Sequence, residues 1–85
     1  MVEKLSVNIK ISSLNAEHNF LIPFDMNVGE ATLLIIQILL DEYPDINVNH
    51  LLEYRLVQVF SGKFLNSGCS FRQLGIVQGE KLMLI

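Results

Sequence analysis

The fold of this chain is decided by residues 55–85, RLVQVFSGKFLNSGCSFRQLGIVQGEKLMLI, in which short apolar runs alternate with turns that contain glycine. Apolar runs of this length, bounded by Gly, Asn and Ser clusters, predict strands joined by tight turns. We expect a strand over Arg55–Phe60, a short strand at Phe64-Leu65 and a final strand over Lys81–Ile85. The loop before the final strand has apolar residues spaced so that they can bury it: Phe71, Leu74 and Ile76.

Working outward, the amino-terminal segment predicts a hairpin. Apolar and polar residues alternate strictly over Leu5–Ile11, which is the period-two pattern of a strand with one buried face. The polar stretch Ser12–Asn19 is expected to form the turn, and Phe20–Phe24 the second arm. Pro23 cannot donate a backbone hydrogen bond, so it marks an exposed side or an end of that arm.

A single helix is predicted between the hairpin and the later strands. Asn27 followed by Glu30 resembles a capping box, which places the first helical residue at Val28. Tyr43-Pro44 is expected to end the helix, because proline disfavours a helical conformation in the residue before it.

This helix has more apolar surface than one core requires. At about 100° per residue, the face assigned to the sheet contains six residues: Val28, Ala31, Thr32, Ile35, Ile38 and Leu39. A second stripe consists of Leu33, Ile36 and Leu40. Either the loop Ile46–Leu52 covers this second stripe, with Ile46 and Val48 as anchors, or the stripe is a surface for a partner or for a homodimer.

The element order of two strands, one helix and further strands predicts an α+β fold with a mixed sheet of four or five strands on one main helix. It further predicts that the first and last strands pair in parallel at the centre. This order is that of the ubiquitin-like β-grasp fold. Residues 55–85 resemble ubiquitin without a gap, with matches at Phe60, Gly62, Lys63, Leu65, Gly68, Ile76, Leu82 and Leu84.

Nearly the whole chain is similar to the YukD/EsaB-like family, small bacterial ubiquitin-like proteins associated with type VII secretion of WXG100 substrates. The similarity depends on Phe20–Pro23, on the helix opening at Val28, on Gly62, and above all on Ile76–Leu82. The longer segment Pro44–Leu52 departs from the family pattern, and so does Gln58 at a position often apolar in the family.

Two orientations of the Arg55–Phe60 strand are possible from the sequence. Simple alternation would bury Val57 and Val59, whereas the gapless match to ubiquitin turns Leu56, Gln58 and Phe60 inward. We favour the gapless match, because Phe60-Ser61-Gly62 determines where the turn falls. The resemblance then implies an outward apolar patch of Val59, Met83 and Ile85, where ubiquitin has its main recognition surface. The alternative is that these are ordinary exposed apolar atoms that bind nothing.

The sequence ends in Met83-Leu84-Ile85, without the Gly-Gly terminus through which ubiquitin and sulfur-carrier relatives act. We therefore expect a ubiquitin-like protein that is not conjugated. Two alternatives remain: a domain cut from a larger membrane component of such secretion systems, or a sulfur carrier whose tail is missing.

Composition is typical of one domain over residues 1–85, with 51% hydrophobic and 18% charged residues. The net charge of −3 and the scattered Lys and Arg residues argue against nucleic acid as a partner. A single cysteine and no signal peptide at the start of the sequence predict a cytoplasmic location. The longest apolar run, Leu33–Leu40, contains Gln37 and is too short to insert across a membrane.

No residue pattern predicts an enzyme, a cofactor site or a metal site. Cys69 follows Gly68 in a turn without an identifiable catalytic base, and His18 and His50 lack metal-ligand spacing. Gly62-Lys63 precedes a strand rather than a helix, unlike a phosphate-binding loop. The sequence therefore predicts a non-catalytic module that binds proteins, with components of type VII secretion as candidate partners.

Overall fold

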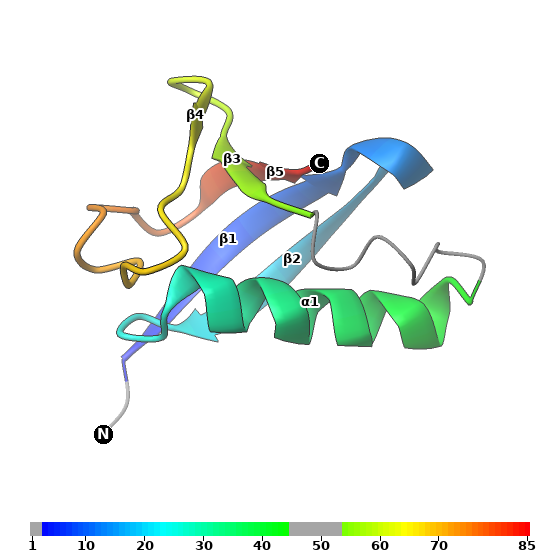
Figure 1. The fold of residues 1–85 in the computed structure, drawn as a ribbon, viewed down its shortest axis with the longest axis horizontal. Helices are drawn as coiled ribbons and strands as arrows, with labels where there is room; N and C mark the ends of the chain where they lie inside the picture. Colours follow the sequence, from blue (N-terminus) through cyan, green and yellow to red (C-terminus); the bar gives the residue numbers. More distant parts are fainter. Residues whose placement is uncertain (1–2, 45–53) are drawn as a thin grey trace.

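The computed structural model describes residues 3–44 and 54–85. Its elements, in chain order, are β1 (Lys4–Ile11), the 3-10 turn η1 (Ser12–Leu14), β2 (Ala16–Pro23), α1 (Val28–Glu42), β3 (Leu56–Gln58), β4 (Lys63–Phe64) and β5 (Glu80–Leu84). The five strands form one sheet in the order β2-β1-β5-β3-β4, and α1 crosses one face of it (Figure 1).

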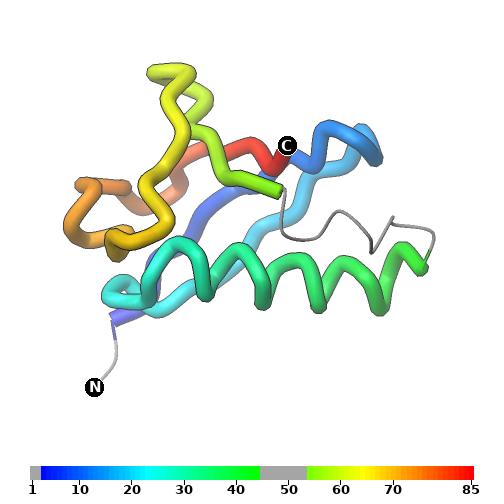
Figure 2. The backbone as a smooth tube through the Cα atoms, in the orientation of Figure 1, coloured from blue at the N-terminus to red at the C-terminus, as the bar shows by residue number. Residues whose placement is uncertain are grey.

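The central pairing of the sheet confirms the predicted topology. β1 and β5 run in parallel, from Val7 opposite Glu80 to Ile11 opposite Leu84, and the other strand pairs are antiparallel. The backbone trace in Figure 2 shows the last strand beside the first. The expected α+β fold, a mixed sheet on one main helix, is therefore confirmed.

The hairpin turn is shorter than the sequence suggested. Ile11 lies opposite Ala16, so β2 begins at Ala16 and the expected turn Ser12–Asn19 is wrong. Asn15 makes the reversal possible with φ 50°, a left-handed conformation that asparagine tolerates. The polar residues Glu17 and Asn19 were mistaken for loop, although they are the outward-facing members of a half-buried strand.

The helix begins and ends where the sequence predicted. The Asn27 side chain accepts a hydrogen bond from the Gly29 N–H (3.1 Å), which satisfies one of the free donors of the first turn. Its Nδ2 also donates to the Gly68 carbonyl (3.2 Å). The N-cap thus holds the helix against the loop that leads to β5.

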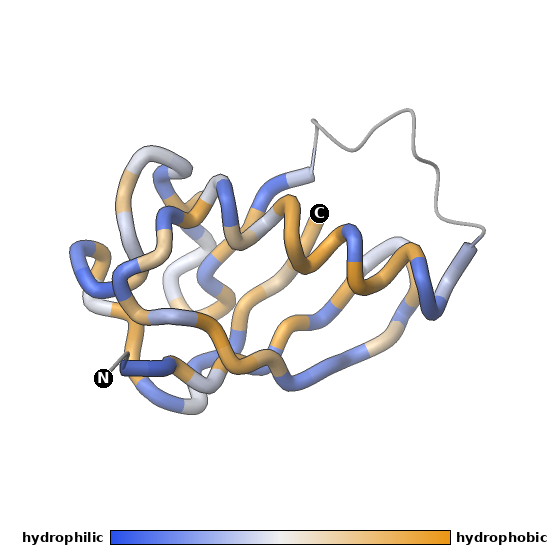
Figure 3. The backbone as a smooth tube through the Cα atoms, turned by 90° about the horizontal axis from the view of Figure 1, so that it is seen from below, coloured by the Kyte–Doolittle hydropathy of each residue, from blue (hydrophilic) through white to orange (hydrophobic). Residues whose placement is uncertain are grey.

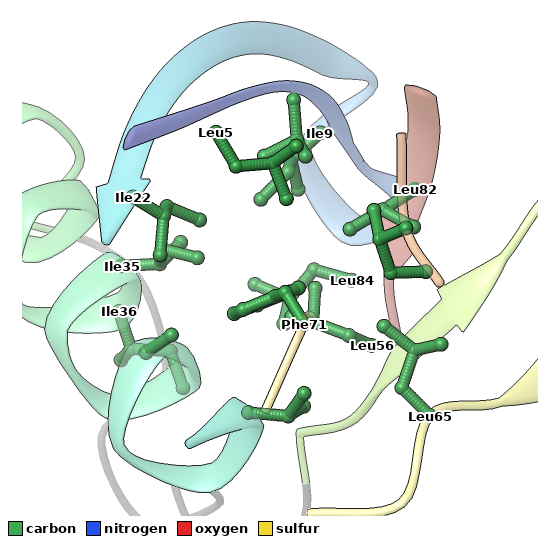
Figure 4. Close-up of a cluster of buried hydrophobic side chains, with 14 of the residues drawn as sticks. Leu5, Ile9, Ile22, Ile35, Ile36, Leu56, Leu65, Phe71, Leu82 and Leu84 are labelled. Carbon is green, nitrogen blue, oxygen red and sulfur yellow. The ribbon is translucent and has the colours of Figure 1, made fainter. Parts of the chain in front are cut away.

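The core corrects the predicted orientation of the helix. Phe71 lies at the centre of a cluster formed by both halves of the chain (Figure 4). Ile36 is 2% exposed and belongs to this cluster, whereas Ile38 is 54% exposed. The placement of Ile36 in an outer stripe and of Ile38 in the core was therefore wrong. The two flanks of the helix are equally apolar in sequence, and only the packing of Leu56, Leu65 and Phe71 determines which one is buried.

The third strand follows the inward and outward pattern of the gapless match but ends early. Leu56 is buried, and Gln58, opposite buried Leu82, is half-buried. Phe60 is 87% exposed, so its predicted inward position is wrong. The strand stops at Gln58 because the Gly62 N–H donates to the Gln58 carbonyl (2.8 Å) and Gly62 has φ 71°, a conformation that glycine adopts without strain.

Gln58 is satisfied on the inner side of the sheet. Its Nε2 donates to Glu80 Oε2 (2.6 Å), and its Oε1 accepts from the Ser61 hydroxyl (2.6 Å). The polar Gln58 side chain therefore links β3 to β5 and to the following turn, and its polar atoms are hydrogen-bonded.

Candidate protein-binding surface

The outer face of the sheet has an apolar patch across three strands. Val57 lies opposite Met83 on β5 and opposite Phe64 on β4, so these side chains share the face turned away from α1. Val59 lies at one end of this row, with its N–H donating to the Lys81 carbonyl (3.3 Å). Ile85 lies at the other end, where it exchanges two backbone hydrogen bonds with Arg55.

We call these five residues the sheet-face patch: Val57, Val59, Phe64, Met83 and Ile85. Three were predicted from the sequence, and the structure brings Val59, Met83 and Ile85 onto one face. Val59 and Ile85 are exposed and Met83 is half-buried, as suits neighbours on a pleated surface.

The gapless match already turns Val57 outward, although the predicted patch did not include it, and sequence reasoning missed Phe64. Phe64 is 64% exposed on the edge strand β4, and it is the largest side chain of the patch. Its neighbour Leu65 is buried, so the alternation of the short Phe64-Leu65 strand contained the signal that one of the two faces outward.

Basic residues surround the sheet-face patch in a chain that is otherwise acidic. Lys10 lies opposite Met83, Lys81 lies two residues before Met83 on the outer face of β5, and Arg55 is paired with Ile85. α1, on the other side of the sheet, contains Glu30, Asp41 and Glu42 and no basic residue. Around the patch the outer face is therefore the more basic one, with Glu17 of β2 opposite Lys10 as its acidic neighbour. The sheet-face patch is suited to an apolar partner surface with an acidic rim.

The three residues of the helix stripe, predicted as an alternative binding surface, do not form one exposed surface. Ile36 is core, Leu40 is half-buried against the core, and Leu33 is 45% exposed. Leu33 lines a hollow of about 330 Å³ between α1 and the chain around Tyr54 and Leu65. The loop Ile46–Leu52, which was expected to cover this stripe, lies outside the described residues. The helix itself is mainly hydrophobic along its length (Figure 3).

Cys69 and His18 have side chains that could be reactive, and both residues form hydrogen bonds within the fold. The Cys69 carbonyl accepts from the Val28 N–H (2.8 Å), and its N–H donates to Asn66 (3.1 Å), so its backbone supports the helix start. His18 Nε2 lies 2.9 Å from the Tyr43 hydroxyl. Over residues 3–44 and 54–85, no three His, Cys, Asp or Glu side chains are grouped so that they could hold a metal ion. His50 lies outside the described residues.

One ion cluster joins the loop after β4 to the hairpin, away from the patch. Arg72 Nε lies 2.7 Å from Asp25 Oδ1 and its Nη2 lies 2.9 Å from Glu3 Oε2, while the guanidinium stacks 4.4 Å from the centre of the Phe24 ring. The hydrogen bond to Asp25 and, to a smaller extent, the one to Glu3 raise the pKa of the Arg72 guanidinium above its ordinary value. The cluster holds the loop in place.

Comparison of the structure with solved proteins shows which fold this is. The ubiquitin of Caldiarchaeum subterraneum superposes with a TM-score of 0.74 at 17% identity, covering 98% of this chain and 92% of that one. The ubiquitin-like domain of Plasmodium falciparum Dsk2 gives 0.69 at 22% identity, with 96% of each chain covered. The fold is ubiquitin-like.

A third similar structure is the ubiquitin-like domain of the Mycobacterium tuberculosis type VII secretion system protein EccD1. It gives a TM-score of 0.70 at 14% identity and covers 98% of each chain. No protein-family profile matches the sequence, and no curated protein matches it. At these identities the similarity shows the ubiquitin-like fold alone, and the three structures do not distinguish secretion from other functions of that fold. Within the described part of the chain, no helix is long and apolar enough to cross a membrane.

Proposed function

We propose that this ubiquitin-like domain is a non-catalytic protein-binding module, which docks a partner on the sheet-face patch and serves as an accessory of a bacterial type VII (WXG100) secretion system. The observation that supports docking most directly is the row of exposed Phe64 and half-buried Val57 and Met83, apolar side chains in register on one face with Lys10, Lys81 and Arg55 around them. The proposal retains the cytoplasmic location expected from the sequence.

Support for the secretion pathway comes from two sources. The sequence resembles the YukD/EsaB-like family over Phe20–Pro23 and Ile76–Leu82, and the structure is similar to the EccD1 domain of a type VII secretion system. Both observations concern fold-determining residues, so the pathway has to be tested separately from the docking surface.

The proposed mechanism is burial of an aromatic anchor within a charged rim. Aromatic side chains at the centre of an interface contribute a large share of binding energy, and truncating such an anchor costs about 2 kcal/mol or more. The Lys and Arg residues around the patch would steer an acidic partner and make the association rate depend on salt. Nothing in this mechanism needs a bond to be made or broken.

The test is to place a photo-crosslinking amino acid at Phe64 or Val57 in the native cell and to identify the crosslinked protein by mass spectrometry. Components of the WXG100 secretion system are expected. Binding of the purified component is then measured for wild type and for Phe64→Ala, which should raise Kd at least about tenfold.

Val77→Ala is the matched control, because Val77 is 60% exposed and lies outside the sheet-face patch. An equal loss of affinity in both variants would remove the patch from the mechanism. A crosslinked partner unrelated to secretion would retain the docking surface and contradict the pathway.

A second candidate has a specific observation in its favour: the EccD1 match is itself to a domain of a secretion protein. This chain would then be the ubiquitin-like domain of a larger component. The codons downstream of Ile85 in the gene, together with the intact mass of the native protein, distinguish the two candidates.

A further inference from the structure

β2 is an edge strand with backbone groups that the rest of the described chain does not use. The Phe24 N–H donates to the Glu3 carbonyl (3.0 Å), one residue beyond the first pair of the register, Lys4 with Pro23. The Ser6 carbonyl accepts from Gly79 and the Ser6 N–H donates to Gln78, so Ser6 is bonded toward β5 and not toward its partner Leu21. Hydrogen-bonded and non-bonded pairs alternate in an antiparallel ladder. Glu17, Asn19 and Leu21 therefore point three N–H and three C=O groups away from the sheet.

An antiparallel second copy of β2 can satisfy all six groups in one register only. If the two-fold axis passes through Asn19, then Asn19 lies opposite Asn19 of the second copy, and Glu17 lies opposite Leu21. A register centred on residue 18 or 20 leaves Leu21 or Glu17 without a full partner, because Asn15 is in the turn and Pro23 has no N–H. A register centred on Glu17 places two carboxylates opposite each other.

The same register matches side chains on both faces of the seam. On the inner face, His18 of each copy lies opposite Phe20 of the other, and these rings already contact each other within one chain, with centroids 6.3 Å apart. Four rings would therefore cluster around the axis. On the outer face, Asn8 Nδ2 donates to Asn19 Oδ1 (3.0 Å), so the two copies would form a continuous row of four asparagines.

The helix beside β2 also favours a second copy. A hollow of about 100 Å³ separates the free edge from α1, with Leu34 and Ile38 on its helical wall and Phe20 on its strand wall, and a strand added to β2 closes its open side. The carboxyl end of α1 contains Asp41 and Glu42 and lies near His18, through the Tyr43 contact. About an axis at Asn19 this acidic end would lie beside the Pro23 end of β2 in the second copy. Lys4, which is paired with Pro23, points to the opposite face of the sheet and does not offset this charge.

We propose that two copies of this chain pair through β2 about a two-fold axis at Asn19, so that their sheets form one continuous sheet. Strand order places the patches on the same side of that sheet, on the wings far from the seam. Five strand spacings separate the two β5 strands, roughly 24 Å at 4.8 Å each. The dimer does not depend on the proposed function. If the sheet-face patch does bind a partner, the dimer would present two such sites to a bivalent target.

Disulfide trapping tests the register directly. In a Cys69→Ser background, Asn19→Cys places two thiols opposite each other in a hydrogen-bonded pair with Cα atoms about 5.5 Å apart, within the range of a disulfide. Glu17→Cys is the matched control, because the two thiols would be about 14 Å apart along the seam. Under mild oxidation the Asn19→Cys variant should form covalent dimers. The Glu17→Cys variant should form them only when mixed with the Leu21→Cys variant.

Molar mass by light scattering, from low micromolar to millimolar protein, provides the second measurement. The Cys69→Ser protein should approach twice its chain mass, and Asn19→Pro should remain monomeric with an unchanged circular dichroism spectrum. Proline is tolerated there because the Asn19 N–H points away from β1. The proposal is overturned by a monomer at every concentration, by a dimer that persists in a folded Asn19→Pro variant, or by equal trapping of the Asn19→Cys and Glu17→Cys variants. A monomer that instead captures a strand-forming peptide at β2 also overturns it.

Discussion

Replacing Ile36 by alanine should destabilise the domain far more than the same change at Leu33. Ile36 is 2% exposed and packs in the core, whereas Leu33 is 45% exposed. Truncating a buried Ile removes its transfer energy and leaves a cavity, which costs about 2–5 kcal/mol. For the half-exposed Leu33 we expect about 1 kcal/mol or less.

These magnitudes are large relative to the whole domain. At about 0.05–0.15 kcal/mol per residue, 85 residues give a free energy of unfolding of roughly 4–13 kcal/mol. Since a domain of this size loses about 4–8 °C in Tm per kcal/mol, Ile36→Ala should lower Tm by roughly 8–40 °C. Leu33→Ala should lower it by no more than about 8 °C.

Urea and thermal unfolding, followed by far-ultraviolet circular dichroism, measure both variants against wild type. The midpoint in urea should fall while its slope stays unchanged, which identifies a loss of stability rather than a change in compactness. A loss at Leu33 as large as the loss at Ile36 would refute the orientation of α1 by showing that Leu33 is buried as well. A loss at Ile36 as small as that expected for Leu33 would restore the helix stripe as a surface of three residues.

Three further predictions concern local structure. Asn27→Ala should cost about 1 kcal/mol in urea unfolding, because it removes the cap on Gly29, and Asn27→Asp should retain most of the stability. An Asp variant no more stable than the Ala variant would contradict the capping role. Gly62→Ala should cost roughly 1–2 kcal/mol from its positive φ alone, since no atom lies within 4 Å of the added methyl, and Gly68→Ala should change stability by less than about 1 kcal/mol. Thr32→Val should cost at most about 1 kcal/mol, because the lost Thr32 hydroxyl bond to the Val28 carbonyl (2.8 Å) supplements a helical bond; a loss of several kcal/mol would show that this reasoning is wrong.

The sequence was sufficient to predict an element where its periodicity and its capping or turn residues agree. Alternation over Leu5–Ile11, the Asn27 cap and the Tyr43-Pro44 stop predicted β1 and both ends of α1. Local signals are enough for these elements because capping and proline geometry act within one turn of the chain.

The predicted burial of a residue was wrong where the local sequence allows two positions and tertiary packing determines which one is buried. Ile36 and Ile38 lie on opposite flanks of the same apolar face, and only the position of residues 54–76 buries one of them. Phe60 resembled an inward strand residue, although the bond from Gly62 to Gln58 ends β3 before it.

Only part of the candidate surface was predicted, because the rest depends on strand pairing that the local sequence does not determine. Val59, Met83 and Ile85 followed from the resemblance, since strand phase and parallel pairing were both correct. Val57 was left out of the predicted patch, although the favoured register turned it outward. Phe64 was missed because its position depends on the pairing of β3 with β4, two short strands with little alternation to reveal their facing. The free edge of β2 was hidden because its polar outer residues resembled a loop.

The most direct test of the central claim is an NMR titration of the isotope-labelled domain with the partner captured at Phe64. The account predicts that the amide shifts which change most belong to Val57, Phe64, Met83 and Ile85, with the exposed residues of α1 unaffected. Changes concentrated on Leu33 and Leu40, or no change at the sheet-face patch when the partner is saturating, would contradict it.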